Sequence, residues 1–191
     1  MKKQNKLNAI LIILAAIAFG LACSGGNQAD VANKAVDEAN KKLDEAKELY
    51  GKTETRNTKL FSPNIQTYQQ LQNYKADKND EAKSIVKDYE KVSEMLKEVS
   101  RQYDDISRMN VHEKYKDYAK LKSDEYAKRA EAVNIRKGNA QAFAEIDDPR
   151  TMTAKFDENN AKSDRLFKDA EELGAKAKKI EEENKDIFKE A

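Results

Sequence analysis

Few residues in this chain could carry catalysis or bind a metal, and their spacing leaves them without partners. His112 is the only histidine and Cys23 the only cysteine among the 191 residues, so no second histidine or cysteine is available to complete a metal site or to assist a catalytic one. The run Glu181–Glu182–Glu183 is typical of a solvated helix face. We therefore expect no metal and no cofactor.

Two pairs of neighbouring acids are the remaining candidates for acid–base chemistry. Hydrolysis by two carboxylates needs both in one pocket at a set separation. Asp104–Asp105, however, is expected at the end of one helix and Asp147–Asp148 at the start of another, where acids are exposed or cap the helix. The sequence also has no phosphate-binding glycine loop and no nucleophile elbow, so we predict that the protein is not an enzyme.

Cys23 stands at the junction between an apolar segment and a polar one. Residues 1–6 read MKKQNK, with three lysines and no acid, and residues 9–19 are wholly apolar. A basic start followed by a short apolar run and small residues is typical of a secretory signal peptide. The run is shorter than the roughly 18–20 residues of a membrane-spanning helix. We predict a signal peptide over residues 1–22; the alternative is a buried core helix.

The residues Gly20-Leu21-Ala22-Cys23 resemble the lipobox of bacterial lipoproteins. Ala22 fits the family pattern, whereas Gly20 stands where the family usually has leucine; looser lipoboxes of this kind occur among spirochaetes. The resemblance implies that a diacylglyceryl group is attached to the Cys23 sulfur, that the chain is cut before Cys23, and that the new amino terminus is acylated, for instance with palmitate. Ser24 would, by the sorting rule of enteric bacteria, direct the protein to the outer membrane, on its periplasmic face or at the cell surface.

The same residues allow a second interpretation. Gly20-Leu21-Ala22 has the small-x-small pattern that ordinary signal peptidase cuts, which would give a soluble secreted protein with a free thiol at Cys23. The position of the single cysteine at the first mature residue favours the lipoprotein. Neither product could contain an internal disulfide.

The charge of the chain excludes several kinds of partner. The chain has 36 basic and 35 acidic residues, and removal of residues 1–22 takes away three lysines and leaves a net charge of −2. Binding of nucleic acid needs a basic excess, and so does a polybasic membrane-binding face. We therefore expect neither.

The mature chain has the composition of long amphipathic helices, with 37% charged residues, no tryptophan and two prolines. We predict a lipidated cysteine and flexible tether over residues 23–30 and one helical domain over residues 31–191. Apolar spacing places the first helix from about Ala29 to Tyr50, ended by Gly51. A loop should follow over residues 52–61, because the period is lost there.

The second helix shows the clearest pattern. Ser62–Pro63 suits a helix start, and apolar residues then recur at strict 3-4 spacing from Ala82 to Ile106, which is typical of a coiled-coil-like seam. The same register places Lys75 and Lys78 in the seam. The helix should therefore be poorly packed or broken over residues 75–80.

A tight turn over Ser107–Asn110 leads into the third helix, with Asn110 as its cap and His112 on the surface of its first turn. Lys122 interrupts its apolar face, and we expect the Lys122 stem to pack while the ammonium reaches water. This helix should end at Gly138, with a short helical turn over residues 140–146. Several tyrosines should form a layer between the second and third helices, either as core or as a recognition surface; the periodicity favours core.

Asp148 and Pro149 should start the last helix, which runs to about Lys189. Its inward positions are often small or polar, which permits close helix approach. The expected fold is all-α: an elongated up-and-down bundle of three long helices plus a shorter N-terminal helix, with coiled-coil-like packing.

These features predict a membrane-anchored envelope lipoprotein with a structural or protein-interaction role. Its partners would be the membrane, through Cys23, and an envelope or host protein, and the helix seams also allow an oligomer. Covalent wall attachment, as in the murein-linked lipoproteins, is not expected, because the sequence ends Lys189-Glu190-Ala191 rather than in lysine. One alternative is a bundle that binds a lipid or small apolar ligand, which would need an apolar cavity of several hundred Å³. Another is a secreted binding or inhibitor protein acting through residues 52–61.

Overall fold

The computed structural model describes residues 28–189, which fold into helices joined by short segments, with no strand in that range. The helices are α1 (Ala29–Leu60), α2 (Tyr68–Ser107), α3 (Glu113–Glu145), α4 (Pro149–Glu183) and the short α5 (Lys185–Lys189). The all-α class and the packing of helices into a bundle are confirmed. The segment predicted to be a signal peptide, Cys23, Ser24 and the last two residues lie outside the described residues.

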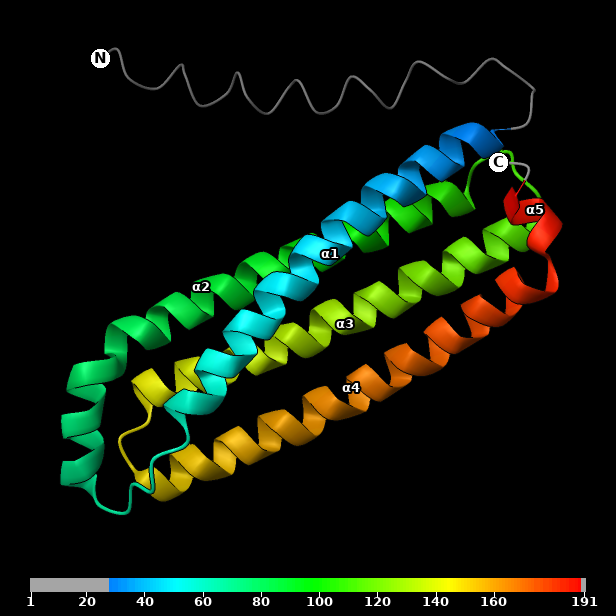
Figure 1. The fold of residues 1–191 in the computed structure, drawn as a ribbon. Helices are drawn as coiled ribbons and strands as arrows, with labels where there is room; N and C mark the ends of the chain where they lie inside the picture. Colours follow the sequence, from blue (N-terminus) through cyan, green and yellow to red (C-terminus); the bar gives the residue numbers. More distant parts are fainter. Residues whose placement is uncertain (1–27, 190–191) are drawn as a thin grey trace, which may run out of the picture.

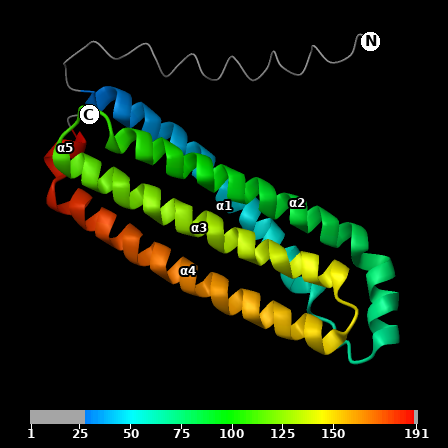
Figure 2. The ribbon, with the colours of Figure 1, turned by 180° about the vertical axis from the view of Figure 1, so that it is seen from behind.

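The helices run alternately up and down around a central hairpin of α2 and α3 (Figure 1). α1 packs along α2, and α4 packs along α3; Figure 2 shows the same arrangement from behind. One end of the bundle holds the start of α1, the α2–α3 turn and α5, and we call it the terminal end. The other, the loop end, holds the connections over residues 61–67 and 146–148.

The first helix is longer than the sequence predicts, and the loop expected over residues 52–61 is wrong. α1 starts at Ala29, as predicted, but passes Gly51 and ends at Leu60 after 32 residues. Beyond Gly51 it stays helical because Thr53, Asn57 and Leu60 continue its buried face. Two of these three side chains are polar, so a search for regularly spaced apolar residues does not detect this part of the buried face. The N-terminal helix is therefore comparable in length to the others.

The start of α2 also differs from the prediction at Ser62–Pro63. Thr67 is the N-cap: its hydroxyl accepts a hydrogen bond from the Gln70 N–H at 3.2 Å, and the Gln70 side chain accepts one from the Thr67 N–H at 3.2 Å. This reciprocal pair is a capping box. From there α2 is continuous to Ser107, so the break expected over residues 75–80 is wrong.

Both ends of α3 differ from the prediction. His112, rather than Asn110, caps the helix, and its Nδ1 accepts a hydrogen bond from the Lys114 N–H at 3.1 Å. The side chain of His112 is exposed, as predicted. The helix does not end at Gly138 but continues to Glu145.

For α4, the predicted start is confirmed and the predicted end is wrong. Asp148 accepts a hydrogen bond from the Thr151 N–H at 2.7 Å, and Pro149 is the first helical residue. The helix stops at Glu183 rather than running to Lys189. There Asn184 turns back, and its side-chain amide donates to the carbonyl of Ile180 at 2.7 Å.

The seam of α2 forms the centre of the core, as the 3-4 spacing predicts. Its most deeply buried members are Ile85, Tyr89, Val92, Val99, Tyr103 and Ile106. Tyr103 stacks on Tyr126 of α3 with ring centroids 5.7 Å apart. Tyr89, Tyr103, Tyr115 and Tyr126 are all buried, so the prediction of a tyrosine-rich core is confirmed.

Candidate functional site

The structure does not bring the predicted candidate residues together. Asp104 pairs with Arg108, the C-cap residue of α2, Asp147 pairs with Lys75, and Asp148 caps α4. Among residues 28–189, no group of three or more His, Cys, Asp or Glu side chains is placed to hold a metal ion. Over the same residues, no helix combines the length and the apolar character needed to cross a bilayer.

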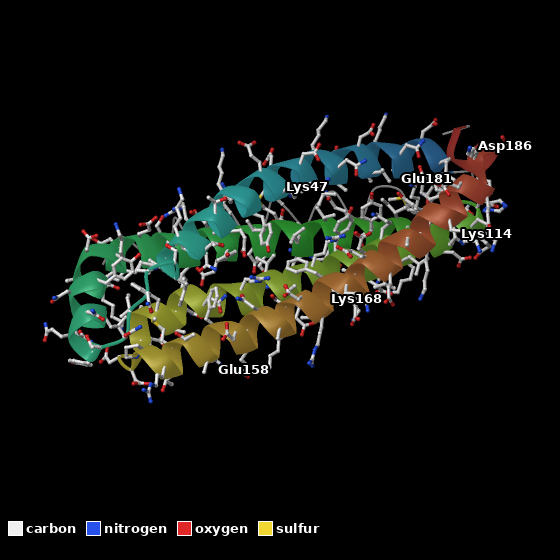
Figure 3. The ribbon with its side chains drawn as sticks, turned by 60° about the horizontal axis from the view of Figure 1, so that its bottom comes forward. Lys47, Lys114, Glu158, Lys168, Glu181 and Asp186 are labelled. Carbon is white, nitrogen blue, oxygen red and sulfur yellow. The ribbon has the colours of Figure 1, made fainter. Side chains whose placement is uncertain are left out.

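A cleft lies instead where α1 and α4 face each other over the α2–α3 hairpin. These two helices meet through large side chains, and the rings of Tyr50 and Phe167 have centroids 5.9 Å apart. Next to this contact the cleft has a volume of about 370 Å³, which is within the range of small-molecule sites. Figure 3 shows Lys47 and Lys168 on the two helices that border it.

The lining of the cleft is mostly apolar and comes from all four long helices. The apolar lining residues are Leu43, Ala46, Tyr50, Val92, Leu96, Tyr126, Val133 and Phe167. Val92, Leu96 and Val133 belong to the buried core. Such a lining is unfavourable to fill with water and favourable to fill with apolar groups.

A charged cluster forms the polar side of the cleft. Glu125 on α3 is only 4% exposed. Its carboxylate accepts a hydrogen bond from the Lys122 ammonium at 2.6 Å and another from Arg129 Nε at 2.9 Å. The Lys122 ammonium also lies 4.7 Å from the centre of the Tyr126 ring, a cation–π distance. The stem of Lys122 is packed as expected, and the side chain keeps 16% exposure, while Glu125 and Tyr126 also hold its ammonium, which the sequence did not predict.

Gly174 makes room for this cluster against α4. A Cβ atom at this position would lie 2.9 Å from Oε2 of Glu125 and 3.2 Å from Oε1, which is closer than side chains approach one another. The three members of the charged cluster also line a groove of about 410 Å³ between α3 and α4, which includes Tyr118 and Lys178. The cluster thus separates an apolar cleft from a polar groove.

The surroundings of the cluster favour the charged form of Lys122. Burial acts to lower the pKa of Lys122, but Tyr126 and Glu125 outweigh it, so the pKa of Lys122 lies above its ordinary value. Burial raises the pKa of Tyr126. At neutral pH the lysine is therefore charged and the tyrosine neutral.

A polar network borders the cleft one helical turn toward the loop end. Arg136 of α3 donates to Glu54 of α1 at 3.0 Å, and to Asn160 and Asp164 of α4 at 2.7 and 2.6 Å. The hydroxyl of Tyr89 on α2 donates to the same Glu54 at 2.5 Å. This network joins α1, α2, α3 and α4.

Sequence reasoning missed the cleft and the residues of its charged cluster. Lys122 and Arg129 stand three and four positions from Glu125, a spacing that favours ion pairs on a helix. That signal was present, but the same spacing recurs along the solvent-facing sides of this highly charged chain. Comparisons of the chain with protein-family models, curated proteins and solved structures found no match.

Proposed function

We propose that this protein is a non-catalytic binding module of the bacterial cell envelope, anchored in the outer membrane by a lipid on Cys23. The observation that carries the proposal is the single cysteine directly after a signal-peptide-like segment, at the first mature residue of a chain rich in amphipathic helices. Its partner in this role is an envelope or host protein.

The start of the described chain supports an anchor near one end of the bundle. Gln28 is tied to the α2–α3 turn: its N–H donates to the carbonyl of Asn110 at 3.0 Å, and its side-chain oxygen accepts from the Asn110 N–H at 2.8 Å. Five residues lead from Cys23 to Gln28, and they can span at most about 18 Å. A lipid on Cys23 would therefore hold the terminal end within about 20 Å of the bilayer, and the loop end, about 50 Å along the bundle, could reach well beyond it.

A second candidate function is favoured by the cleft. A bundle that binds a lipid or small apolar ligand needs an apolar cavity of several hundred Å³. The cleft between α1 and α4 has about this volume, 370 Å³, and supports the proposal with a lining that is mostly apolar and charged on one side. The two candidate functions are compatible, because the anchor would occupy the terminal end of the bundle and leave the cleft between α1 and α4 free.

The anchor is tested by replacing Cys23 with serine in the native host and following the protein by cell fractionation and by labelling with an alkyne analogue of palmitate. The wild-type protein should be labelled and sediment with membranes, whereas Cys23→Ser should be unlabelled and soluble. Ser24→Ala, next to the cysteine, is the matched control and should remain labelled.

Two outcomes would overturn the lipid anchor. One is a Cys23→Ser protein that still sediments with membranes. The other is an unlabelled wild-type protein in the medium whose terminal thiol reacts with maleimide, which would establish the secreted form.

A further inference from the structure

We propose that the cleft between α1 and α4 binds a single-chain amphiphile with a carboxylate head group, such as a long-chain fatty acid. This inference rests on the second candidate function and specifies its ligand class. The apolar chain would lie on Val92, Leu96 and Val133, between Tyr50 and Phe167, and the carboxylate would lie at Arg129.

Arg129 offers unused hydrogen-bond donors at the cleft. Its Nε donates to Glu125, but its two terminal amino groups donate no hydrogen bond to any of the residues 28–189. The side chain is partly exposed, at 29%, so a ligand can reach it. A guanidinium pairs with a carboxylate through two parallel hydrogen bonds, and the fork of Arg129 is already oriented by its bond to Glu125.

The charge balance of the lining favours one negative charge on the ligand. Lys122 and Arg129 carry two positive charges against the single negative charge of Glu125. Lys47, the remaining cation of the lining, has its own partner in Asp44 at 3.3 Å. Within the lining of the cleft itself, one unit of positive charge is therefore left, which a monoanionic head would neutralise and a cationic head would oppose. The groove behind the cluster adds Glu171 and Glu181 against Lys178, so the excess faces the cleft only.

The size of the cleft favours one chain. At about 370 Å³ it lies near the lower limit of small-molecule sites, which suits a single acyl chain better than a two-chain phospholipid. The chain also needs apolar walls on several sides, and the cleft supplies them from α1, α2, α3 and α4.

The test uses purified Cys23→Ser protein, so that no attached lipid competes for the cleft. The probe is the fluorescent fatty acid cis-parinaric acid, displaced by dodecanoate, dodecanol or dodecyltrimethylammonium. We expect saturable binding of parinaric acid, displacement by dodecanoate, and at least tenfold weaker displacement by the neutral and cationic analogues.

Two variants locate the site. Arg129→Gln should weaken dodecanoate binding about tenfold or more and leave dodecanol binding unchanged, because it removes a charge-assisted hydrogen bond. Arg165→Gln, at an exposed position of α4 outside the lining, is the matched control and should bind as the parent does. Ala46→Phe fills the cleft and should abolish binding of both ligands, with helicity checked by circular dichroism.

Three results would overturn the proposal: no parinaric acid binding by the folded parent protein, unchanged dodecanoate affinity in Arg129→Gln, or unchanged binding in a folded Ala46→Phe protein. These results are independent of the anchor, because fractionation of the Cys23→Ser protein tests that separately. Loss of both would leave a secreted helical bundle, whereas loss of fatty-acid binding alone would leave an anchored module that binds a protein.

Discussion

The carboxylate of Glu125 on α3 lies against the backbone of α4 at Gly174, where a Cβ atom would be only 2.9 Å from its Oε2 atom. A glycine inside a helix costs about 1 kcal/mol relative to alanine. At Gly174 the missing side chain leaves space for the buried Glu125 carboxylate, which can therefore bind Lys122 and Arg129 without a steric clash. Gly51 in α1 has nothing within 4 Å of its Cβ position and no such function.

The two glycines should therefore respond in opposite ways to alanine. Gly51→Ala should raise the free energy of unfolding by about 0.5–1 kcal/mol, because it lowers the entropy of the unfolded chain without a clash. Gly174→Ala should lower it by about 1 kcal/mol, because displacement of Glu125 outweighs the gain in helix propensity. Urea denaturation of both variants measures the difference. An equal gain at both positions would contradict the assigned role of Gly174.

Lys75 has a structural role that its position in the seam conceals. Its ammonium donates to the carbonyl of Ile146 at 2.8 Å, to that of Ala144 at 3.4 Å, and to the Asp147 carboxylate at 2.8 Å. It thus binds carbonyl groups at the C-terminal end of α3, in its last turn and at its C-cap residue, where carbonyl groups have no partner within the helix. Gln72 also donates to Asp147, at 2.9 Å.

Replacing Lys75 with methionine should keep the packing of the stem and remove these bonds. We expect the free energy of unfolding to fall by about 1 kcal/mol, because the hydrogen bonds from the Lys75 ammonium to the carbonyls of Ala144 and Ile146 are lost. The hydrogen bonds from Lys75 and then Gln72 lower the pKa of Asp147, so this pKa should rise toward its ordinary value in the variant, as measured by NMR titration. Lys78→Met, one turn further on and paired only with its neighbour Asp77, is the control and should leave the pKa of Asp147 unchanged.

The buried seam of α2 could be predicted from the sequence, but the structural role of Lys75 within it could not. The 3-4 spacing correctly places Lys75 among buried positions. The inference of a broken helix failed because the partners of the ammonium lie on the α3–α4 connection, about 70 residues away. A local sequence pattern predicts which side of a helix faces the core. It does not predict which carbonyl groups from other elements lie within hydrogen-bonding distance of that side.

The same reasoning explains the errors at Gly51 and at the cleft. Gly51 is a good helix end by local chemistry, yet burial of Thr53 and Asn57 keeps the helix going, and neither is an apolar signal. The pair spacing within the charged cluster is visible in the sequence. Its burial, however, depends on Gly174 of α4, and no one-dimensional pattern links the two helices.

Asn57 is a second buried polar group, and this one has no partner. It is 1% exposed, and neither its Oδ1 nor its Nδ2 atom makes a hydrogen bond to the residues that the structure describes. Asn57→Leu, which is close in volume, should therefore raise the free energy of unfolding by about 1–2 kcal/mol. Asn40→Leu on the exposed side of the same helix should change it by no more than about 0.5 kcal/mol. A loss of stability in Asn57→Leu would indicate that an internal water molecule satisfies the amide.

The buried tyrosines predict how the bundle behaves at alkaline pH. Burial is the largest cause that raises the pKa of Tyr50, Tyr89, Tyr103 and Tyr126, and it raises the pKa of Tyr115 to about 12. In the unfolded chain a tyrosine loses its proton near pH 10. The folded state therefore binds more protons than the unfolded state above that pH. The resulting stability is complete below pH 10 and is lost as the pH rises from about 10 through the folded-state values.

We therefore expect cooperative unfolding above about pH 10, in which helicity disappears together with the appearance of phenolate. Circular dichroism at 222 nm and absorbance at 295 nm, recorded on the same samples, measure the two events. Tyr103→Phe keeps the ring that stacks on Tyr126 but removes one ionisable hydroxyl, so it should move the midpoint to higher pH. Tyr68→Phe, at an exposed position, is the control and should leave the midpoint unchanged. Gradual ionisation of the tyrosines at full helicity would show that water reaches the hydroxyl groups in the folded state, which contradicts the closed tyrosine core.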